Sequence, residues 1–344
     1  MWYSTKVNRS RSQTIGKSFL LCVLFFQSAT FCQAETAGDQ VKGHTGRLRQ
    51  LLAKLNLSVD EAAGFRRELD LIDTLVSSGN LFQGIDYLQH TSVELNTYEY
   101  VRSKARVALE GINAFENEWK RVGHELDSKQ KEILENGNPN LPAAVTALIE
   151  CSLTQVQPYY KSGLLYGRNT TIDAGLYYVG LAPSNLDFAL FCQRLKFPNP
   201  NPSTKLRSIE PELEALAVAV TKAFQSSVKP NNERAFIEIN SKLKMARELN
   251  AERRYAGALK TYLDALLYFG SINGSVPELT VEALKKQTNE LRTRLTASPN
   301  DETIGLIYIE MVLSAKSDAE MNRGAIIIEQ VLPSYLKSQE KPNQ

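Results

Sequence analysis

Histidine is scarce in this sequence: only His44, His90 and His124 occur among 344 residues. A zinc-protease pattern needs a second histidine four residues after the first, and Ser128 stands at that distance from His124. The sequence also lacks a Gly-x-Ser-x-Gly nucleophile elbow and a phosphate-binding loop. These absences argue against a histidine-based metal site and a catalytic triad. We therefore expect no catalytic or metal-ligating residues of these kinds and no cofactor.

Without residues 1–34, the chain carries almost no net charge. The chain has 40 basic and 38 acidic residues, and four of the basic ones lie in that first stretch. The 310 residues that follow carry 36 basic and 38 acidic side chains, a net charge of −2. Electrostatic attraction to nucleic acid or to an acidic membrane surface therefore has no support, and we expect no nucleic-acid partner.

Long apolar runs are missing too. The run Phe19–Phe26 has eight residues, whereas a bilayer-spanning helix needs about 20. The run follows a basic start and precedes Cys32 and Ala34, which is typical of an export signal. We predict a signal peptide over 1–34, cleavage after Ala34, and a protein exported to the periplasm or the cell exterior, with no membrane span after cleavage. Acylation at Cys32 and an uncleaved anchor are the alternatives.

Cysteine is sparse after the predicted signal, where only Cys151 and Cys192 remain. Two cysteines cannot form a disulfide framework for a chain of this size. In an oxidising compartment they can form a single bond. We expect a Cys151–Cys192 disulfide, with two buried thiols packed as small apolar groups as the alternative.

Period-two alternation is absent, and apolar residues instead recur at spacings of three and four, as in helices. Ser58 and Glu61 form a capping-box pattern at one expected helix start. We expect one helix over 97–122 and a disturbed helix at Pro158. We also expect two short helices separated by Pro183, with Ser184 capping the second. We predict an all-α fold of paired antiparallel helices, either tetratricopeptide-like or an irregular helical array.

The chain is expected to divide into two helical regions. The N-terminal helical region covers 35–196, and the Pro/Asn-rich stretch 197–208 is the expected linker. The C-terminal helical-repeat-like region covers 209–340. Its expected helices lie near 210–225, 233–250, 254–269, 278–296, 301–316 and 318–337.

One helical pair carries a family resemblance, within residues 242–269. Ala246 lies on its first expected helix, and Ala258, Tyr262 and Ala265 lie on its second. Small, aromatic and small residues at these spacings resemble the tetratricopeptide repeat, in which small residues let two helices approach closely. The resemblance implies stacked helical hairpins that bind a protein or an extended peptide. The pattern does not recur 34 residues later, so the resemblance covers essentially one hairpin.

Aromatic residues concentrate in the segment 157–197, with charged residues between them. Aromatic faces with interleaved polar groups can line a ligand groove, and they can equally form the core of a helical unit. As contacts for a ligand or peptide we name Tyr160, Tyr166, Arg168, Tyr177, Tyr178 and Arg194.

The sequence favours a non-enzymatic helical scaffold of the cell envelope that binds a protein or peptide. This expectation rests on fold class alone. The alternatives are an enzyme that acts on cell-wall polymer through carboxylates, and a small-ligand carrier that uses the aromatic segment 157–197. A buried acid pair in a cleft would favour the enzyme, and a closed apolar pocket would favour the carrier.

Overall fold

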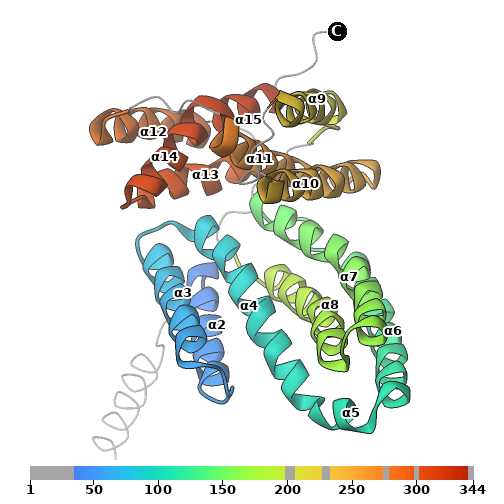
Figure 1. Ribbon diagram of the computed structural model, residues 1–344. Coiled ribbons are helices and arrows are strands. Elements are labelled where there is room, and N and C mark those ends of the chain that lie inside the picture. The colour runs from blue at the N-terminus through green and yellow to red at the C-terminus, as the bar shows by residue number, and fades with distance from the viewer. Residues whose placement is uncertain (1–34, 198–205, 227–232, 274–278, 298–301, 340–344) are drawn as a thin grey trace, which may run out of the picture. The chain divides into compact units, whose positions relative to one another are not determined.

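The computed structural model describes residues 35–197, 206–226, 233–273, 279–297 and 302–339 (Figure 1). The predicted signal peptide over 1–34 and most of the expected linker lie outside these described residues. Thr36–Gln344 form one compact unit, which contains both expected helical regions.

The first part of this unit is a succession of helices joined by short turns. Neighbours along the chain pack against each other, and α4 also packs on α8. The helices are α2 (Ala37–Leu52), α3 (Val59–Ser77), α4 (Leu81–Ser103), α5 (Ala105–Glu110), α6 (Ile112–Glu135), α7 (Ala143–Asn169) and α8 (Ile172–Gln193).

The second part is helical as well, and α10 and α11 form its most extensive pair. Its elements are α9 (Glu210–Ser226), α10 (Glu233–Ala251), α11 (Tyr255–Asn273), α12 (Val281–Thr296), α13 (Thr303–Ser314), α14 (Asp318–Ile326), the π-helical turn η2 (Ile327–Val331) and α15 (Leu332–Gln339). Within the described ranges the fold contains antiparallel helix pairs and no strand, which confirms the all-α prediction.

Local sequence signals explain several helix ends. The Ser58 hydroxyl accepts from the Glu61 amide, and the Glu61 carboxylate accepts from the Ser58 amide, so the expected capping box is present. Gly79 follows α3 with a φ of 84°, a left-handed conformation that glycine adopts at little cost. Arg253, at the expected break between α10 and α11, has a φ of 62°.

Two predictions about helix boundaries were wrong. The single helix expected over 97–122 is divided among α4, α5 and α6, with one break at Lys104 and a second at Gly111, which takes a φ of 90°. The two short helices expected around Pro183 are one helix, α8, and α7 likewise continues through Pro158. Ser184 is therefore no helix cap, and its hydroxyl instead donates to the Gly180 carbonyl at 2.8 Å.

Packing between α7 and α8 accounts for their length. A Cβ atom on Gly175 would lie 2.6 Å from the Cα of Gly167, so the two backbones meet where neither residue has a side chain. Such close packing along two long helices outweighs the single backbone hydrogen bond that each proline removes.

Buried apolar side chains form two clusters. The N-terminal core draws on α2 to α8 and includes Phe115, Leu148 and Phe188. The C-terminal core draws on α9 to α15 and also takes Ala144 and Cys151 from α7. Since α7 contributes to both cores, it links them through one rigid element.

The helical pair at 242–269 packs as its small residues predict. Ala246, Ala258 and Ala265 are fully buried, and Tyr262 is nearly so. The predicted burial of these residues is confirmed, whereas the tetratricopeptide resemblance itself stays a prediction. No helix within the described part of the chain is long and apolar enough to cross a membrane.

Candidate functional site

Most of the residues predicted as ligand contacts pack inside the fold, between neighbouring helices. Tyr160 stacks on Trp119 with ring centroids 4.6 Å apart, and its hydroxyl donates to the Trp119 carbonyl at 3.1 Å. Tyr166 stacks on Tyr178 at 4.3 Å. These stacked pairs hold α7 against α6 and α8.

Two of the other three predicted contacts also have side-chain partners within the fold. The Tyr177 hydroxyl donates to Glu94 at 2.7 Å, and Arg168 forms an ion pair with Glu116 at the same distance. Arg194 is exposed at the end of α8. Tyr166, Tyr177 and Tyr178 meet through their rings, with the centroids of Tyr177 and Tyr178 5.8 Å apart, but none of the six residues lines the cavity described below.

The cysteines are free thiols in the structure, so the expected Cys151–Cys192 disulfide is not formed. Cys151 belongs to the C-terminal core, where its sulfur lies 3.3 Å from the Thr261 hydroxyl. Cys192 is fully buried in the N-terminal core. Separate burial in two cores is the physical reason that the bond is missing. The two buried thiols match the alternative expectation, in which both pack as small apolar groups.

A cavity of about 460 Å³ lies where the two cores meet. Charged residues of both signs line it: Asp86, Glu94, Asp264, Lys242, Lys260 and Arg323. Apolar and aromatic side chains form much of the rest of its wall: Tyr87, Val93, Tyr159, Leu181, Met245, Leu267, Tyr268 and Met311. His90 and Arg323 are exposed, so the cavity opens to solvent beside them.

Helical periodicity explains why two helices, α4 and α11, supply more than half of this lining. On α4, Asp86, His90 and Glu94 follow each other at intervals of four and therefore share one face. On α11, Lys260, Asp264 and Tyr268 repeat the same spacing. The two faces meet across the cavity, and side chains of α7, α8, α10, α13 and α14 form the remaining wall.

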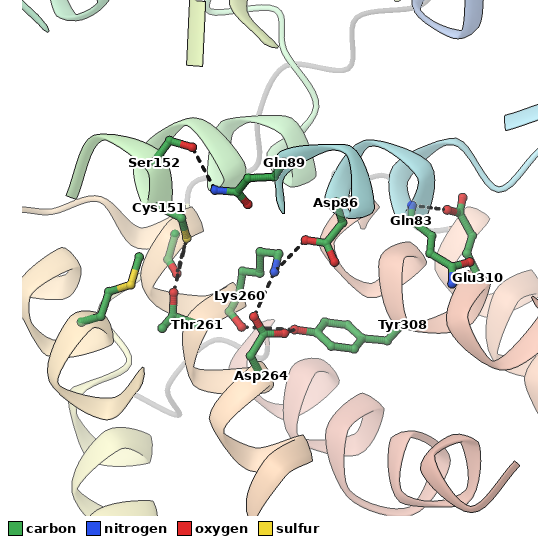
Figure 2. Close-up of polar contacts among 12 residues, drawn as sticks. Gln83, Asp86, Gln89, Cys151, Ser152, Lys260, Thr261, Asp264, Tyr308 and Glu310 are labelled. Atoms are coloured by element: carbon green, nitrogen blue, oxygen red, sulfur yellow. Dashed lines mark hydrogen bonds and ion pairs between the residues drawn. The ribbon is translucent and has the colours of Figure 1, made fainter. Parts of the chain in front are cut away.

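Lys260 is the most deeply buried charge of the cavity, with a side chain only 8% exposed. Its ammonium lies 2.9 Å from a carboxylate oxygen of Asp86 and 2.9 Å from one of Asp264 (Figure 2). The Tyr308 hydroxyl donates to the other oxygen of Asp264 at 2.8 Å. We call Lys260, Asp86, Asp264 and Tyr308 the ion cluster.

The ion cluster fixes the charge states of its members. Burial alone would lower the pKa of Lys260, but the charges of Asp264 and Asp86 outweigh it and raise the pKa above its ordinary value. Burial acts to raise the pKa of Asp264, and the charges of Lys260 and Lys242 overcome it and lower that pKa. Lys260 is therefore an ammonium at neutral pH and does not act as a general base. Asp264 is a carboxylate at neutral pH and does not act as a general acid.

Other polar contacts join the same helices. Across the boundary between the cores, α4 and α7 face α11 and α13, and we call this boundary the seam. The Glu150 carboxylate on α7 accepts from the Gly257 amide of α11 at 2.6 Å. The Glu310 carboxylate on α13 accepts from the Gln83 amide of α4 at 2.7 Å (Figure 2). The seam thus carries the ion cluster, these two contacts and the cavity.

Both of these glutamates have perturbed acidities. Burial raises the pKa of Glu150 to about 7, although the Gly257 amide and Arg254 act in the opposite direction. Burial likewise raises the pKa of Glu310 to about 8, against the Gln83 amide and Arg292. Among the described residues, no group of three or more histidine, cysteine, aspartate or glutamate side chains is placed to hold a metal ion.

Sequence reasoning missed the ion cluster, although one signal was present. In the 19-residue helix α11, Lys260 and Asp264 are the only charged residues, and they stand four apart in an otherwise apolar sequence. An isolated pair of opposite charges at that spacing indicates a buried ion pair. Its third member, Asp86, is distant in sequence and could not be identified from the pattern.

In comparisons with protein-family models, curated proteins and solved structures, nothing matches this chain.

Proposed function

We propose that this protein is a non-enzymatic binding protein and that it takes a peptide segment into the seam cavity. The observation that carries the proposal is the mixed lining of that cavity, in which charges of both signs alternate with aromatic and apolar side chains. A volume of about 460 Å³ lies within the range of natural ligand sites, roughly 300–1,000 Å³.

A peptide suits this lining better than an apolar molecule. Its backbone supplies both donors and acceptors, and Gln89, Gln155 and Asn185 offer matching groups on the cavity wall. Its apolar side chains can contact Met245 and Leu267. Lys242, whose ammonium lies 5.2 Å from the centre of the Tyr268 ring, places a positive charge beside an aromatic face.

The helical pair that resembles the tetratricopeptide repeat supports the same role. Its two helices, α10 and α11, supply Lys242, Met245, Lys260, Asp264 and Tyr268 to the cavity. That family's helical hairpins bind extended peptides, so the resemblance and the cavity point to one surface.

The two alternatives have less support. An enzyme that cleaves cell-wall polymer needs a carboxylic acid that donates a proton to the bound substrate. Asp264 is held ionised by Lys260, and Glu150 and Glu310, whose pKa values burial raises, do not belong to the cavity lining. A carrier of apolar ligands needs an apolar chamber, whereas this cavity is lined by six charged side chains. From the aromatic segment 157–197, only Tyr159, Leu181 and Asn185 reach the cavity.

The proposed setting is the cell envelope or the cell exterior. It rests on the basic start, the short apolar run and the residues Cys32 and Ala34. An exported binding protein of this kind meets peptides outside the cytoplasm, and its role there is to retain or present them.

Affinity selection with a defined probe tests the proposal. The full chain is mixed with an equimolar library of synthetic tetrapeptides, and retained peptides are identified by mass spectrometry after size exclusion. Gln155→Trp fills the cavity from α7, where the glutamine amide donates a hydrogen bond to the Met245 sulfur at 3.9 Å. Lys161→Trp, on an exposed position of the same helix, is the matched control.

We expect the wild type and Lys161→Trp to retain the same subset of peptides, and Gln155→Trp to lose at least about tenfold in retention. Equal retention by Gln155→Trp would place binding elsewhere. Retention of no peptide by the wild type would contradict the proposed function.

A further inference from the structure

Glu94 differs from the other two carboxylates of the cavity wall, because it has no cation. Asp86 and Asp264 share the ammonium of Lys260, which lies 2.9 Å from each. Glu94 is half-buried on α4, and no lysine, arginine or histidine in the described part of the chain forms an ion pair with it. Charged side chains that are withdrawn from water generally pair with an opposite charge. This carboxylate is therefore open to a cation from outside the fold.

Tyrosines from three helices accompany this carboxylate. The Tyr177 hydroxyl of α8 donates to one Glu94 oxygen at 2.7 Å, and within the described ranges no hydrogen bond reaches the other oxygen. Tyr98 follows Glu94 by four residues on α4 and therefore lies on the same helix face. Tyr159 of α7 lines the cavity together with Glu94.

The tyrosine rings stand at angles to one another. Tyr98 and Tyr177 meet edge to face with centroids 6.1 Å apart, and Tyr177 meets Tyr178 in the same way at 5.8 Å. Tyr159 is tilted against Tyr178, with centroids 6.5 Å apart. All four tyrosines are half-buried, so part of each side chain reaches solvent. We call Glu94 and these four tyrosines the tyrosine site.

The charges around the tyrosine site favour a cation. Burial, and after it the charge of Glu94, raises the pKa of Tyr98 and of Tyr159, so both rings are neutral at neutral pH. Two further acidic residues also act on these tyrosines: Glu61 on Tyr98, and Glu238 on Tyr159. Neutral aromatic faces beside acidic side chains attract a cation electrostatically.

We propose that the tyrosine site binds the side chain of an arginine. A guanidinium can donate to the open oxygen of Glu94 and lie flat against a tyrosine face at the same time. Arginine suits a half-buried aromatic surface better than lysine, since its cation is planar and less strongly hydrated. Because Glu94 and Tyr159 also line the cavity, this arginine belongs to a peptide held there, and that part of the inference rests on the proposed function.

Packing alone is the competing explanation of the tyrosine site. It accounts for the ring contacts, which join α4, α7 and α8. It gives no reason for an acidic side chain among these rings without a cation, when the other two carboxylates of the cavity have one. The two explanations differ in whether a free guanidinium binds.

Small probes test the tyrosine site without a peptide. N-acetyl-arginine methylamide is titrated into the full chain, and its dissociation constant is measured by ligand-observed NMR. The citrulline analogue has nearly the same shape but no charge, and it serves as the control probe. We expect the arginine probe to bind at least about tenfold more tightly than the citrulline probe, and the lysine analogue to bind more weakly than arginine.

Variants separate the charge from the rings. Glu94→Gln keeps an acceptor for Tyr177 but removes the charge, so the arginine probe should then bind no better than citrulline. Glu99→Gln, half-buried on the same helix but outside the cavity lining, is the matched control and should keep the preference. Tyr159→Leu removes one ring and should weaken the arginine probe at least about threefold, with little effect on citrulline. Thermal unfolding verifies that each variant is folded.

The outcomes for the tyrosine site and for the proposed function are distinct. Equal binding of arginine and citrulline by the wild type, no binding of either, or an unchanged preference in Glu94→Gln would overturn the tyrosine site. Lysine binding as tight as arginine would overturn the choice of arginine. Selected tetrapeptides without enriched arginine would refute the site and leave the proposed function intact. A bound arginine probe with no retained peptide would support the site and refute the proposed function.

Discussion

The ammonium of Lys260 lies 2.9 Å from the carboxylate of Asp86, and this contact joins α11 to α4 across the seam. Because Asp264 lies equally close to Lys260, one cation is shared by two anions in a poorly hydrated position. Its partners hold such a buried cation in place, and removing them would destabilise the fold by leaving the charge unpaired. The ion cluster thus forms one wall of the cavity and also fixes the helices that carry it.

Removal of Lys260 should strongly destabilise the fold. Lys260→Met keeps the length of the side chain but leaves Asp86 and Asp264 without their cation, and the loss of one partner from a buried ion pair costs about 3 kcal/mol. Urea unfolding at neutral pH measures this loss. Lys244→Met, at a side chain 79% exposed, should stay within about 0.5 kcal/mol of the wild type. Equal stability of the two variants would mean that the ion cluster contributes nothing.

The crossing of α7 and α8 should tolerate no added methyl group. Gly175→Ala places a Cβ 2.6 Å from the Gly167 backbone, and we expect a loss of about 1–3 kcal/mol from overpacking. Gly64→Ala lies within α3 with nothing within 4 Å of the new atom, so it should stabilise the protein by about 0.5–1 kcal/mol. Thermal unfolding compares the two. A neutral Gly175→Ala would show that the helices can separate at this point.

His44 should make stability depend on pH under acidic conditions. The Arg47 guanidinium donates to its Nδ1 at 2.8 Å, so its Nε2 carries the proton and donates to the Ser92 hydroxyl at 3.0 Å. Burial and then Arg47 lower the pKa of His44 to about 4. The unfolded chain therefore binds this proton more tightly, and stability is lost as the pH falls from 6.5 towards 4.

The expected contribution of His44 is about 2–3 kcal/mol over this window. His44→Phe keeps a ring beside Phe191, whose centroid is 4.3 Å from that of His44, and should flatten this part of the pH profile. His124→Phe, at an exposed position, should keep the wild-type slope. Urea midpoints at several pH values measure both variants. An unchanged slope in His44→Phe would refute the assignment.

The helices were largely predictable because their causes are local. The capping residue Ser58, the break at Arg253 and the spacing of alanines around Ala258 each act within one or two turns. The errors arose where distant contacts override local preference. Pro183 interrupts no helix because α7 packs closely on α8, and Gly111 breaks a pattern that is otherwise continuous.

The site was less predictable, because it is made of residues that are distant in sequence. Nothing near Asp86 marks it as a partner of Lys260, and nothing near Glu310 marks it as the acceptor for Gln83. The aromatic composition of 157–197 predicted ligand contacts there, but most of its rings pack between α6, α7 and α8. The cavity instead uses the polar faces of α4 and α11, which only the tertiary fold brings together.

The most direct measurement of the proposed function is the labelling of Cys151 in the presence of a peptide obtained by affinity selection. Cys151 lines the cavity, and Cys192 does not. At a fixed pH and saturating peptide, the labelling rate of Cys151 should fall in proportion to the fraction of the protein without peptide, by about 100-fold at 100 times the dissociation constant, while that of Cys192 stays the same. A peptide that binds tightly yet leaves the Cys151 rate unchanged, or slows both cysteines equally, would contradict binding in the seam cavity.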